Sequence, residues 1–277
     1  MRCVILTMSS LFNTPKFKAD RYRDFRPLYP RGMFRGLAPV LRKNPLFLDL
    51  GCGAGQSTRS FLELGWAPEG FAVDPDPAMI AAARADLASD FPRVRFLEGC
   101  AEKIPLAEGS VDLVLIGSAI HWFDLSRARA EIERVLKPSG ILFVFEYQFP
   151  KSLDGPELAE RVRRRFNLEW KAPIQKPRGR LTDLLVPFRQ AGGWRNLPEE
   201  RVEWAEVLSL DAFLGHLFSQ SRYLHAEAAS PDPEKYREDV RACFAPAFSE
   251  KPLRFDLKPK ALALKRDALI VSNRGPC

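Results

Sequence analysis

Between about residue 46 and residue 147, short apolar runs alternate with longer stretches in which apolar residues recur every three or four positions. The short runs predict buried β-strands, and the longer periodic stretches predict helices that pack by one face. We expect strands at residues 47–50, 70–73, 94–97, 111–116 and 141–147. We expect helices at residues 56–64, 76–90 and 126–136.

These strands and helices alternate, and the connections between them are short. Two parallel strands need a crossover connection, which is usually a helix. The pattern therefore predicts an α/β fold with a doubly wound, mostly parallel sheet. The run at residues 111–116 is almost entirely apolar, which is typical of a strand covered on both faces.

After Pro150 the alternation of short apolar runs and periodic stretches becomes less regular. We expect helices at residues 156–170, 181–191, 211–219 and 233–248. The segments 202–208 and 253–264 alternate enough to be strands, and we expect both to join the same sheet. A short helix is also expected at residues 32–41, ahead of the first strand.

The first predicted strand runs directly into a glycine-rich turn, Asp49-Leu50-Gly51-Cys52-Gly53-Ala54-Gly55. Glycines at such a turn let the backbone pass close to a bound nucleotide-like ligand. Gln56 stands where a dinucleotide site has the glycine that lets helix and strand pack around a pyrophosphate. The turn therefore fits an NAD-type dinucleotide poorly.

Asp74 ends the next predicted strand, nineteen residues after Gly55. A carboxylate at this place can accept hydrogen bonds from both hydroxyls of a ribose. A further turn, Gly99-Cys100-Ala101-Glu102, follows the third strand. The three features fall along one edge of the predicted sheet, so together they fit a ligand with an adenine, a ribose and a tail without phosphate.

These motifs resemble those of the class I S-adenosylmethionine-dependent methyltransferases, whose fold is Rossmann-like. The resemblance covers about residues 45–147. It implies a seven-stranded sheet with a helical insertion or lid, which binds S-adenosyl-L-methionine and releases S-adenosyl-L-homocysteine. The stretches that carry it are residues 48–55, 73–74, 99–105, 111–114, 119–124 and 134–140.

Two further features narrow the resemblance. The segment Tyr22-x-x-x-Arg26-Pro27-x-Tyr29-Pro30 precedes the first strand, and His121-Trp122-Phe123 follows the fourth. Both are similar to the trans-aconitate methyltransferase-like branch of the type 11 methyltransferases, which methylates carboxylates of small molecules. The carboxy-terminal half has only a loose likeness, through Phe218-x-x-Ser221-x-Tyr223, so the identity of the substrate does not carry over.

We expect a single domain over residues 1–277, since a chain of this length can bury the core of one domain. Its expected parts are an N-terminal lid and helix (1–45), a cofactor-binding core (46–150), a helical insertion on the substrate side with one added strand (151–250), a closing strand (251–265) and a tail (266–277).

The resemblance assigns a set of residues to the cofactor. Asp49 is expected to orient the glycine turn and to reach the amino group of the methionine moiety, directly or through water, and Asp74 to hold the ribose. Glu102 is expected at the adenine edge, with a surface salt bridge as its alternative. The full set is Tyr22, Arg26, Tyr29, Asp49, Gly51, Gly53, Ala54, Gly55, Gln56, Thr58, Asp74, Pro75, Met79, Ala101, Glu102, Ser118 and His121.

Residues before the first strand are expected to close over the cofactor, with Tyr22, Arg26 and Tyr29 at the contact. Arg26 could pair with a carboxylate of the cofactor or of the substrate, because its guanidinium can donate two parallel hydrogen bonds. Gln56 and Thr58 stand at the start of a helix, where capping and ligand contact are equal alternatives.

The segment from Ser118 to His121 follows the fourth strand, where the methyl group should face its acceptor. A lone histidine is often structural; at this position His121 is also a candidate general base for a hydroxyl or carbon-acid acceptor. An ionised carboxylate acceptor would need no base. Trp122 is expected to form a wall of the pocket, and Arg222 and Tyr223 to contact the substrate.

The net charge of +7 is unevenly spread along the chain. Residues 46–150 contain nine Lys or Arg against fifteen Asp or Glu, whereas residues 1–45 and 161–195 each contain ten basic residues against two acidic ones. A solvated basic surface and a surface that faces an anionic substrate both fit this pattern.

The five cysteines are odd in number and scattered, and none lies in a CxxC pair or beside a histidine. This usage indicates a reducing, cytoplasmic location and argues against disulfides and a metal site. No apolar run approaches the roughly 18 residues that a membrane span requires. The first eight residues are too short and lack a cleavage site for a secretory leader, so Met8 is an alternative start.

The sequence thus predicts a methyltransferase that transfers a methyl group from S-adenosyl-L-methionine to a small, anionic acceptor by in-line displacement, with no metal. Alternatives are a lipid or quinone methyltransferase, an RNA methyltransferase and a non-catalytic protein that binds S-adenosyl-L-methionine. The basic flanks permit nucleic-acid binding, but no Asn/Asp-Pro-Pro-aromatic motif or recognisable RNA-binding module supports it. The sequence leaves the oligomeric state open.

Overall fold

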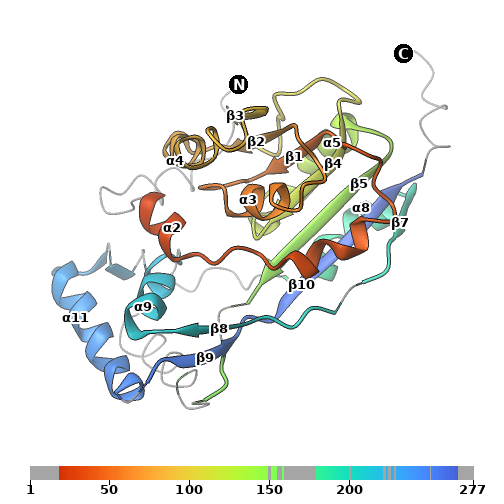
Figure 1. Ribbon diagram of the computed structural model, residues 1–277. Coiled ribbons are helices and arrows are strands. Elements are labelled where there is room, and N and C mark those ends of the chain that lie inside the picture. Colours follow the sequence, from red (N-terminus) through yellow and green to blue (C-terminus); the bar gives the residue numbers. More distant parts are fainter. Residues whose placement is uncertain are drawn as a thin grey trace.

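A seven-stranded sheet forms the centre of the protein (Figure 1). The computed structural model describes residues 19–148, 151–154, 158, 179–199, 201–220, 223, 226–227, 229–249 and 251–267. The strand order is β3-β2-β1-β4-β5-β10-β7. The bounds are β1 Phe47–Leu50, β2 Gly70–Asp74, β3 Val94–Glu98, β4 Val111–Gly117, β5 Leu136–Tyr147, β7 Trp194–Asn196 and β10 Pro259–Arg266.

Strands β1 to β5 are mutually parallel, and β10 pairs antiparallel with both β5 and β7. The five parallel strands are the five that the apolar runs predict. This sheet confirms the expected α/β fold with a doubly wound, mostly parallel arrangement. Its strand order reverses between β1 and β4, where such folds form a ligand crevice at the carboxyl ends of the strands.

Helices cover both faces of the sheet, and neighbouring residues of a strand point into different cores. Phe47 joins the core beneath η1, α3 and α4, whereas Leu48 joins the core beneath α5, α7 and α8. This explains why the inner strands read as continuous apolar runs. The bounds are η1 Arg31–Leu37, α3 Gln56–Leu62, α4 Pro77–Leu87, α5 Leu125–Val135, α7 Leu181–Leu184 and α8 Val186–Gln190.

A second, three-stranded antiparallel sheet has the order β6-β9-β8. Its strands are β6 Lys151–Ser152, β8 Ala205–Leu208 and β9 Leu253–Asp256. The prediction that residues 202–208 join the main sheet is therefore wrong. Residues 253–264 divide into β9 and β10, which lie in different sheets. The chain changes sheet at Lys258, whose φ of 42° breaks the extended backbone.

A third core lies beside the small sheet and contains Phe213, Phe244 and Phe255. Helix α9 (Leu210–Phe218), helix α11 (Pro233–Phe244) and β9 supply these rings. Phe213 stacks on Phe255 at 5.2 Å between centroids and meets Phe244 edge to face at the same distance. Aromatic packing of this kind stabilises a core beyond the area it buries. A short 3-10 helix η3 (Ala245–Phe248) follows α11.

Helix α2 (Ala19–Phe25) lies between α4 and α9 (Figure 1). A Cβ on Gly215 of α9 would overlap the ring of Phe25, so this glycine makes room for the end of α2. The chain then returns along η1 to the first strand. The 3-10 helix at residues 31–37 replaces the longer helix expected at 32–41.

Other differences are local. The turn expected at residues 137–140 lies within β5, because Leu136 already pairs with Val111 ahead of a bulge. The three-residue strand β7 was not expected, and the helix expected at 156–170 lies outside the described residues.

Cys100 is disulfide-bonded, so the expectation of no disulfide is wrong for this residue. Spacing alone cannot show which cysteines a fold brings together. No helix in the described part of the chain is long and apolar enough to cross a membrane.

Candidate functional site

The glycine turn after β1 is fixed to the neighbouring strand at the carboxyl edge of the sheet. The backbone N–H groups of Gly51 and Cys52 both donate to the carbonyl of Val73 in β2, at 2.8 and 3.1 Å. Gly55 then begins α3 with a left-handed φ of 99°. The turn is therefore a rigid loop that connects a buried strand to the start of a helix.

Glycine is required in this turn for conformation and for space. Gly51, Gly53 and Gly55 have φ values of 76°, 55° and 99°, which residues with a Cβ rarely adopt. A Cβ on Gly51 would lie 2.6 Å from that of Ala119, and one on Gly55 would lie 2.8 Å from Leu87 Cδ1. The residues after β4 thus pack directly on the turn.

Asp49 is fully buried beneath the turn. Its Oδ2 accepts hydrogen bonds from the hydroxyls of Ser57 and Thr58, both at 2.6 Å, whereas its buried Oδ1 has no hydrogen-bond partner. Burial raises the pKa of Asp49 to about 6, against the lowering effect of the two hydroxyls. A buried acceptor without a partner is unfavourable, so Oδ1 is available for a cationic or N–H donor of a ligand.

Asp74 stands at the end of β2 with both oxygens already in use. Oδ2 accepts from the N–H of Gly53 and Oδ1 from the N–H of Asp76, both at 2.9 Å. Burial raises the pKa of Asp74 to about 6, although these two bonds lower it. A carboxylate offers about four lone-pair sites, so each oxygen can still accept from a ribose hydroxyl.

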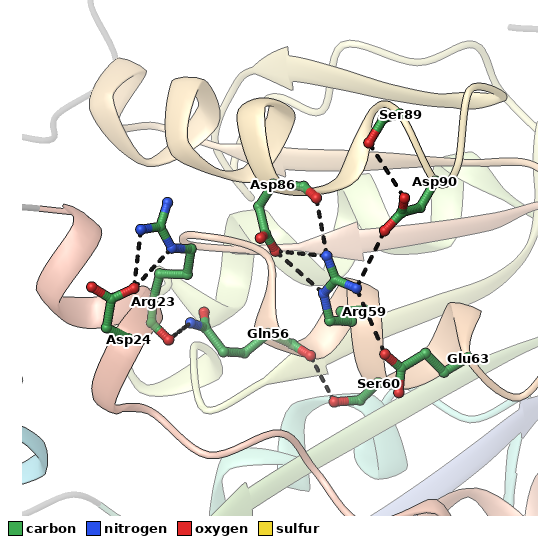
Figure 2. Close-up of polar contacts among 9 residues, drawn as sticks. All are labelled: Arg23, Asp24, Gln56, Arg59, Ser60, Glu63, Asp86, Ser89 and Asp90. Atoms are coloured by element: carbon green, nitrogen blue, oxygen red, sulfur yellow. Dashed lines mark hydrogen bonds and ion pairs between the residues drawn. The ribbon is translucent and has the colours of Figure 1, made fainter. Parts of the chain in front are cut away.

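Gln56 ties the start of α3 to helix α2. Its side-chain N–H₂ donates to the backbone carbonyls of Tyr22 at 3.3 Å and Arg23 at 3.1 Å, and Figure 2 shows the amide directed at Arg23. The same view shows Arg59 of α3 bound to Asp86 of α4. Gln56 therefore fastens the carboxyl end of α2 to a helix that is itself anchored.

Tyr22 of α2 lies over the glycine turn. It packs against the buried cluster of Ala54, Met79 and Ala82. A Cβ added to Gly53 would meet the ring of Tyr22 at 3.6 Å. The helix thus covers the turn.

Arg26 follows α2 and is half-buried at the end of β5. Nη1 donates to the hydroxyl of Tyr147 at 3.0 Å and Nη2 to the carbonyl of Ser219 at 3.2 Å, while the buried Nε has no partner. The guanidinium also lies 5.0 Å from the centre of the Tyr22 ring. No carboxylate within the described ranges forms an ion pair with Arg26. A cation removed from water without a counter-ion is unfavourable and favours binding of an anion.

Tyr29 reaches from the N-terminal segment to the residue that follows β4. Its N–H donates to Ser60 Oγ, and its hydroxyl donates to Ser118 Oγ, each at 2.9 Å. Ser118 has a φ of 54°, which is uncommon for a residue with a side chain. Tyr29 is buried among Phe145, Tyr147 and Trp204, so here it positions the segment after β4.

That segment continues into a short 3-10 helix, η2 (Ile120–Trp122), which places His121 beyond the carboxyl end of β4. The rings of His121 and Trp122 are 5.0 Å apart, and both residues are partly buried. The structure therefore brings the predicted base and pocket wall together beside Ser118.

The remaining predicted residues are distributed along and beyond this edge. Ala101 is buried, and Pro75 is partly buried next to Asp74. The Glu102 carboxylate accepts from the N–H of Asp124 at 2.8 Å, which is a backbone contact instead of a salt bridge. Tyr223 is buried in the third core, and Arg222 lies outside the described residues.

Several residues of the site were not predicted. Ser57 holds Asp49, and Tyr147 and Ser219 hold Arg26. Ser57 begins a helix, where a serine is read as a cap. Tyr147 and Ser219 lie 121 and 193 residues from Arg26, a separation at which periodicity carries no information. The described residues contain no group of three or more His, Cys, Asp or Glu that could hold a metal.

Comparison with known proteins indicates the family of the central region of the chain. Residues 48–144 match the family described as a methyltransferase domain. The chain is 42% identical over 142 residues to an uncharacterised methyltransferase of Mycobacterium tuberculosis, a match that covers 51% of this chain and 54% of that protein. It is 34% identical over 112 residues to the demethylmenaquinone methyltransferase of Chlorobaculum tepidum, covering 40% and 44% of the two chains. The chain spans about half the length of the curated relatives it matches.

A solved structure extends the likeness beyond the matched region. A proposed type II methyltransferase from Anaeromyxobacter dehalogenans superposes with a TM-score of 0.66 at 29% identity, over 86% of this chain and 97% of that one. The similarity therefore includes most of the architecture as well as the glycine turn.

Proposed function

Because residues 48–144 form a class I methyltransferase domain, we propose that the whole protein transfers a methyl group from S-adenosyl-L-methionine to a small carboxylate. One observation carries the cofactor part of this proposal. Asp49 presents a buried oxygen without a partner beneath a turn that only glycine can form. That arrangement suits the ammonium group of the methionine moiety.

The residues around the turn fit the cofactor in chemical kind. Asp49 would accept from the ammonium group, Asp74 from the ribose hydroxyls, and the glycines would let the backbone lie against the ligand. Pro75, Met79, Ala101 and Glu102 would flank the adenine. When bound, S-adenosyl-L-methionine supplies an activated methyl group on a sulfonium, which is a good leaving group.

The main tasks of the protein are then to align the acceptor with the methyl group and to enclose both reactants. A nucleophile must approach the methyl carbon in line with the sulfur, so positioning is the main contribution. Helix α2 covers the turn and would exclude water. Tyr29 and Ser118 would fix the segment that faces the acceptor.

Arg26 supports an anionic acceptor. Its guanidinium is half-buried and has no carboxylate partner in the described part of the structure, so a ligand anion would supply the missing counter-charge. A carboxylate is already ionised and requires no base. If the acceptor were a hydroxyl or carbon acid, His121 would take its proton.

The test supplies methyl-labelled S-adenosyl-L-methionine with panels of carboxylic acids, phenols and lipids. We expect label on a carboxylic acid that is released by mild base, because the product is an ester. Base-stable label on another acceptor would contradict the carboxylate part of the proposal. Absence of any transfer, with tight cofactor binding, would instead favour a non-catalytic binding protein.

A quinone acceptor is the second candidate, because the chain matches a demethylmenaquinone methyltransferase over 112 residues. Activity that depends on detergent or liposomes would favour it. An RNA acceptor predicts a steep fall in RNA binding as salt increases, since phosphate contacts release counter-ions.

A further inference from the structure

Helix α2, which covers the glycine turn, is too short to be stable by itself. It has seven residues, and isolated helices shorter than about 12 residues are marginal in water, so α2 depends on the elements that it packs against. On one side Tyr22 packs over the turn and Gln56 binds two carbonyls of the helix. On the other side lies α9, which belongs to the third core (Figure 1). The cover over the proposed cofactor site is therefore supported from two separate parts of the fold.

The contact between α2 and α9 is built around a glycine. Gly215 lies inside the nine-residue helix α9, where glycine is less favourable than alanine. A Cβ at this position would overlap the ring of Phe25. The overlap includes Cγ, the ring atom nearest the backbone, so the ring cannot avoid it by shifting its far end alone. Helix α9 thus gives up local stability at the point where the end of α2 packs on it.

A hydrogen bond reinforces the same contact. Arg26 Nη2 donates at 3.2 Å to the carbonyl of Ser219, the residue that ends α9. The last carbonyls of a helix lack partners within it and carry a partial negative charge, so a guanidinium is favourable there. Helix α9 is itself held in the third core by Phe213 and Leu217, both fully buried. It is the anchored partner of the pair, and α2 is the supported one.

We propose that Phe25 and Gly215 are positioning residues for the cofactor, because their contact holds α2 against α9 and so keeps Tyr22 over the glycine turn. We call this contact the α2–α9 latch. The inference rests on the proposed function, since it concerns the cover of the same cofactor site. It predicts that a residue of the carboxy-terminal half sets how long S-adenosyl-L-methionine stays bound.

Gly215→Ala tests the latch from the side of α9. Alanine favours a helix more than glycine does, so α9 should lose no stability and any effect should come from displacement of Phe25. We expect stopped-flow dissociation of S-adenosyl-L-homocysteine to accelerate at least about fivefold, and its Kd to rise at least about threefold, because such changes act mainly on the dissociation rate. An unchanged dissociation rate would overturn the inference.

A double-mutant cycle tests whether the two residues act through each other. We expect Phe25→Ala alone to raise the Kd about threefold, and the double variant with Gly215→Ala to resemble Phe25→Ala, since the overlap is then gone. Losses that multiply in the double variant would contradict the latch. Leu28→Ala is the matched control, because Leu28 lies in the same segment and is similarly exposed, at 41% against 37% for Phe25. If it raises the Kd as much as Phe25→Ala, the latch is not the cause.

Amide hydrogen exchange of the ligand-free protein separates the latch from the proposed function. In Gly215→Ala, and in Phe25→Ala as a second variant, we expect exchange in α2 to accelerate about tenfold or more, with no acceleration in α9. Unchanged exchange in α2 would overturn the inference whatever the protein binds. If the wild-type protein fails to bind S-adenosyl-L-homocysteine, the proposed function is refuted, while faster exchange in α2 would still support the latch.

Discussion

Asp49 shows how the burial of a single carboxyl lowers the stability of the folded protein. Burial raises its pKa from 3.8 to about 6, so the folded protein holds the proton more strongly than the unfolded chain does. For a carboxyl of this kind the free energy of unfolding falls as pH rises from about 4 to 6, and the full penalty applies above pH 6. The shift corresponds to roughly 3 kcal/mol.

Asp49→Asn should therefore stabilise the cofactor-free protein. We expect the free energy of unfolding in urea to increase by about 2 to 3 kcal/mol at pH 7.5 and by about half of that at pH 5, because the asparagine carries no charge to bury. The same variant should bind S-adenosyl-L-homocysteine about 10 to 100 times more weakly, since it loses a charge-assisted acceptor. Destabilisation at pH 7.5 would contradict this account of Asp49.

The two carboxyls of the turn also predict how binding depends on pH. Burial raises the pKa of both Asp49 and Asp74 to about 6, and both are proposed to accept from the cofactor in their ionised forms. We expect the Kd for S-adenosyl-L-homocysteine to increase at least about tenfold between pH 7.5 and pH 5. A Kd that stays constant over this range would show that neither carboxylate contributes its charge.

Gly51 and Gly65 form a matched pair for testing the turn. Both have φ near 75°, but a Cβ on Gly51 would lie 2.6 Å from Ala119 Cβ, whereas no atom lies within 4 Å of one on Gly65. We expect Gly65→Ala to lower the free energy of unfolding by about 1 kcal/mol and Gly51→Ala by about 2 kcal/mol more. Equal losses in chemical denaturation would indicate that the close approach to Ala119 is absent.

At the scale of elements, the sequence predicts the parallel part of the fold well and the rest poorly. Strands β1 to β5 are apolar runs joined by short connections, so local pattern and topology agree. The strands β8 and β9 pair across 45 or more residues in a separate sheet, and β7 has only three residues after two glycines. Such pairings depend on contacts distant in sequence.

The candidate site also contains a part that the sequence predicts and a part that it does not. The glycine turn and Asp74 lie close together in the sequence, and their spacing alone predicts a ligand with an adenine, a ribose and a tail without phosphate. The surroundings of Arg26 depend on Tyr147 and Ser219, which only the folded chain brings together. The sequence therefore indicates Arg26 as a candidate anion-binding residue but not the residues that hold its guanidinium.

Gln56 contributes to the attachment of helix α2. Gln56→Leu removes both hydrogen bonds to the carbonyls of Tyr22 and Arg23, each worth roughly 1 kcal/mol. We expect amide hydrogen exchange in α2 to accelerate about tenfold or more, with little change in β1 or β4. Arg23→Gln, which removes the ion pair with Asp24 but keeps the backbone carbonyl that Gln56 binds, is the control and should leave exchange unchanged.

At the scale of the whole molecule, the large sheet holds the proposed cofactor site, and the small sheet packs with α9 and α11 in the third core. Helix α2 contacts both regions, through Tyr22 on the glycine turn and through Phe25 beside Gly215. Charge is also unevenly distributed along the chain, since residues 46–150 are acidic and residues 1–45 are basic. Within the described part of this segment, Arg26 brings positive charge to the edge where an anion is proposed to bind.

The turn after β1 is the proposed binding site for S-adenosyl-L-methionine. Calorimetric titration of the wild-type protein and of Asp74→Ala at pH 7.5, with S-adenosyl-L-methionine and separately with NAD, tests it most directly. We predict one site per chain for S-adenosyl-L-methionine, at least tenfold weaker in Asp74→Ala, and no heat with NAD. Binding of NAD without binding of S-adenosyl-L-methionine would contradict the account.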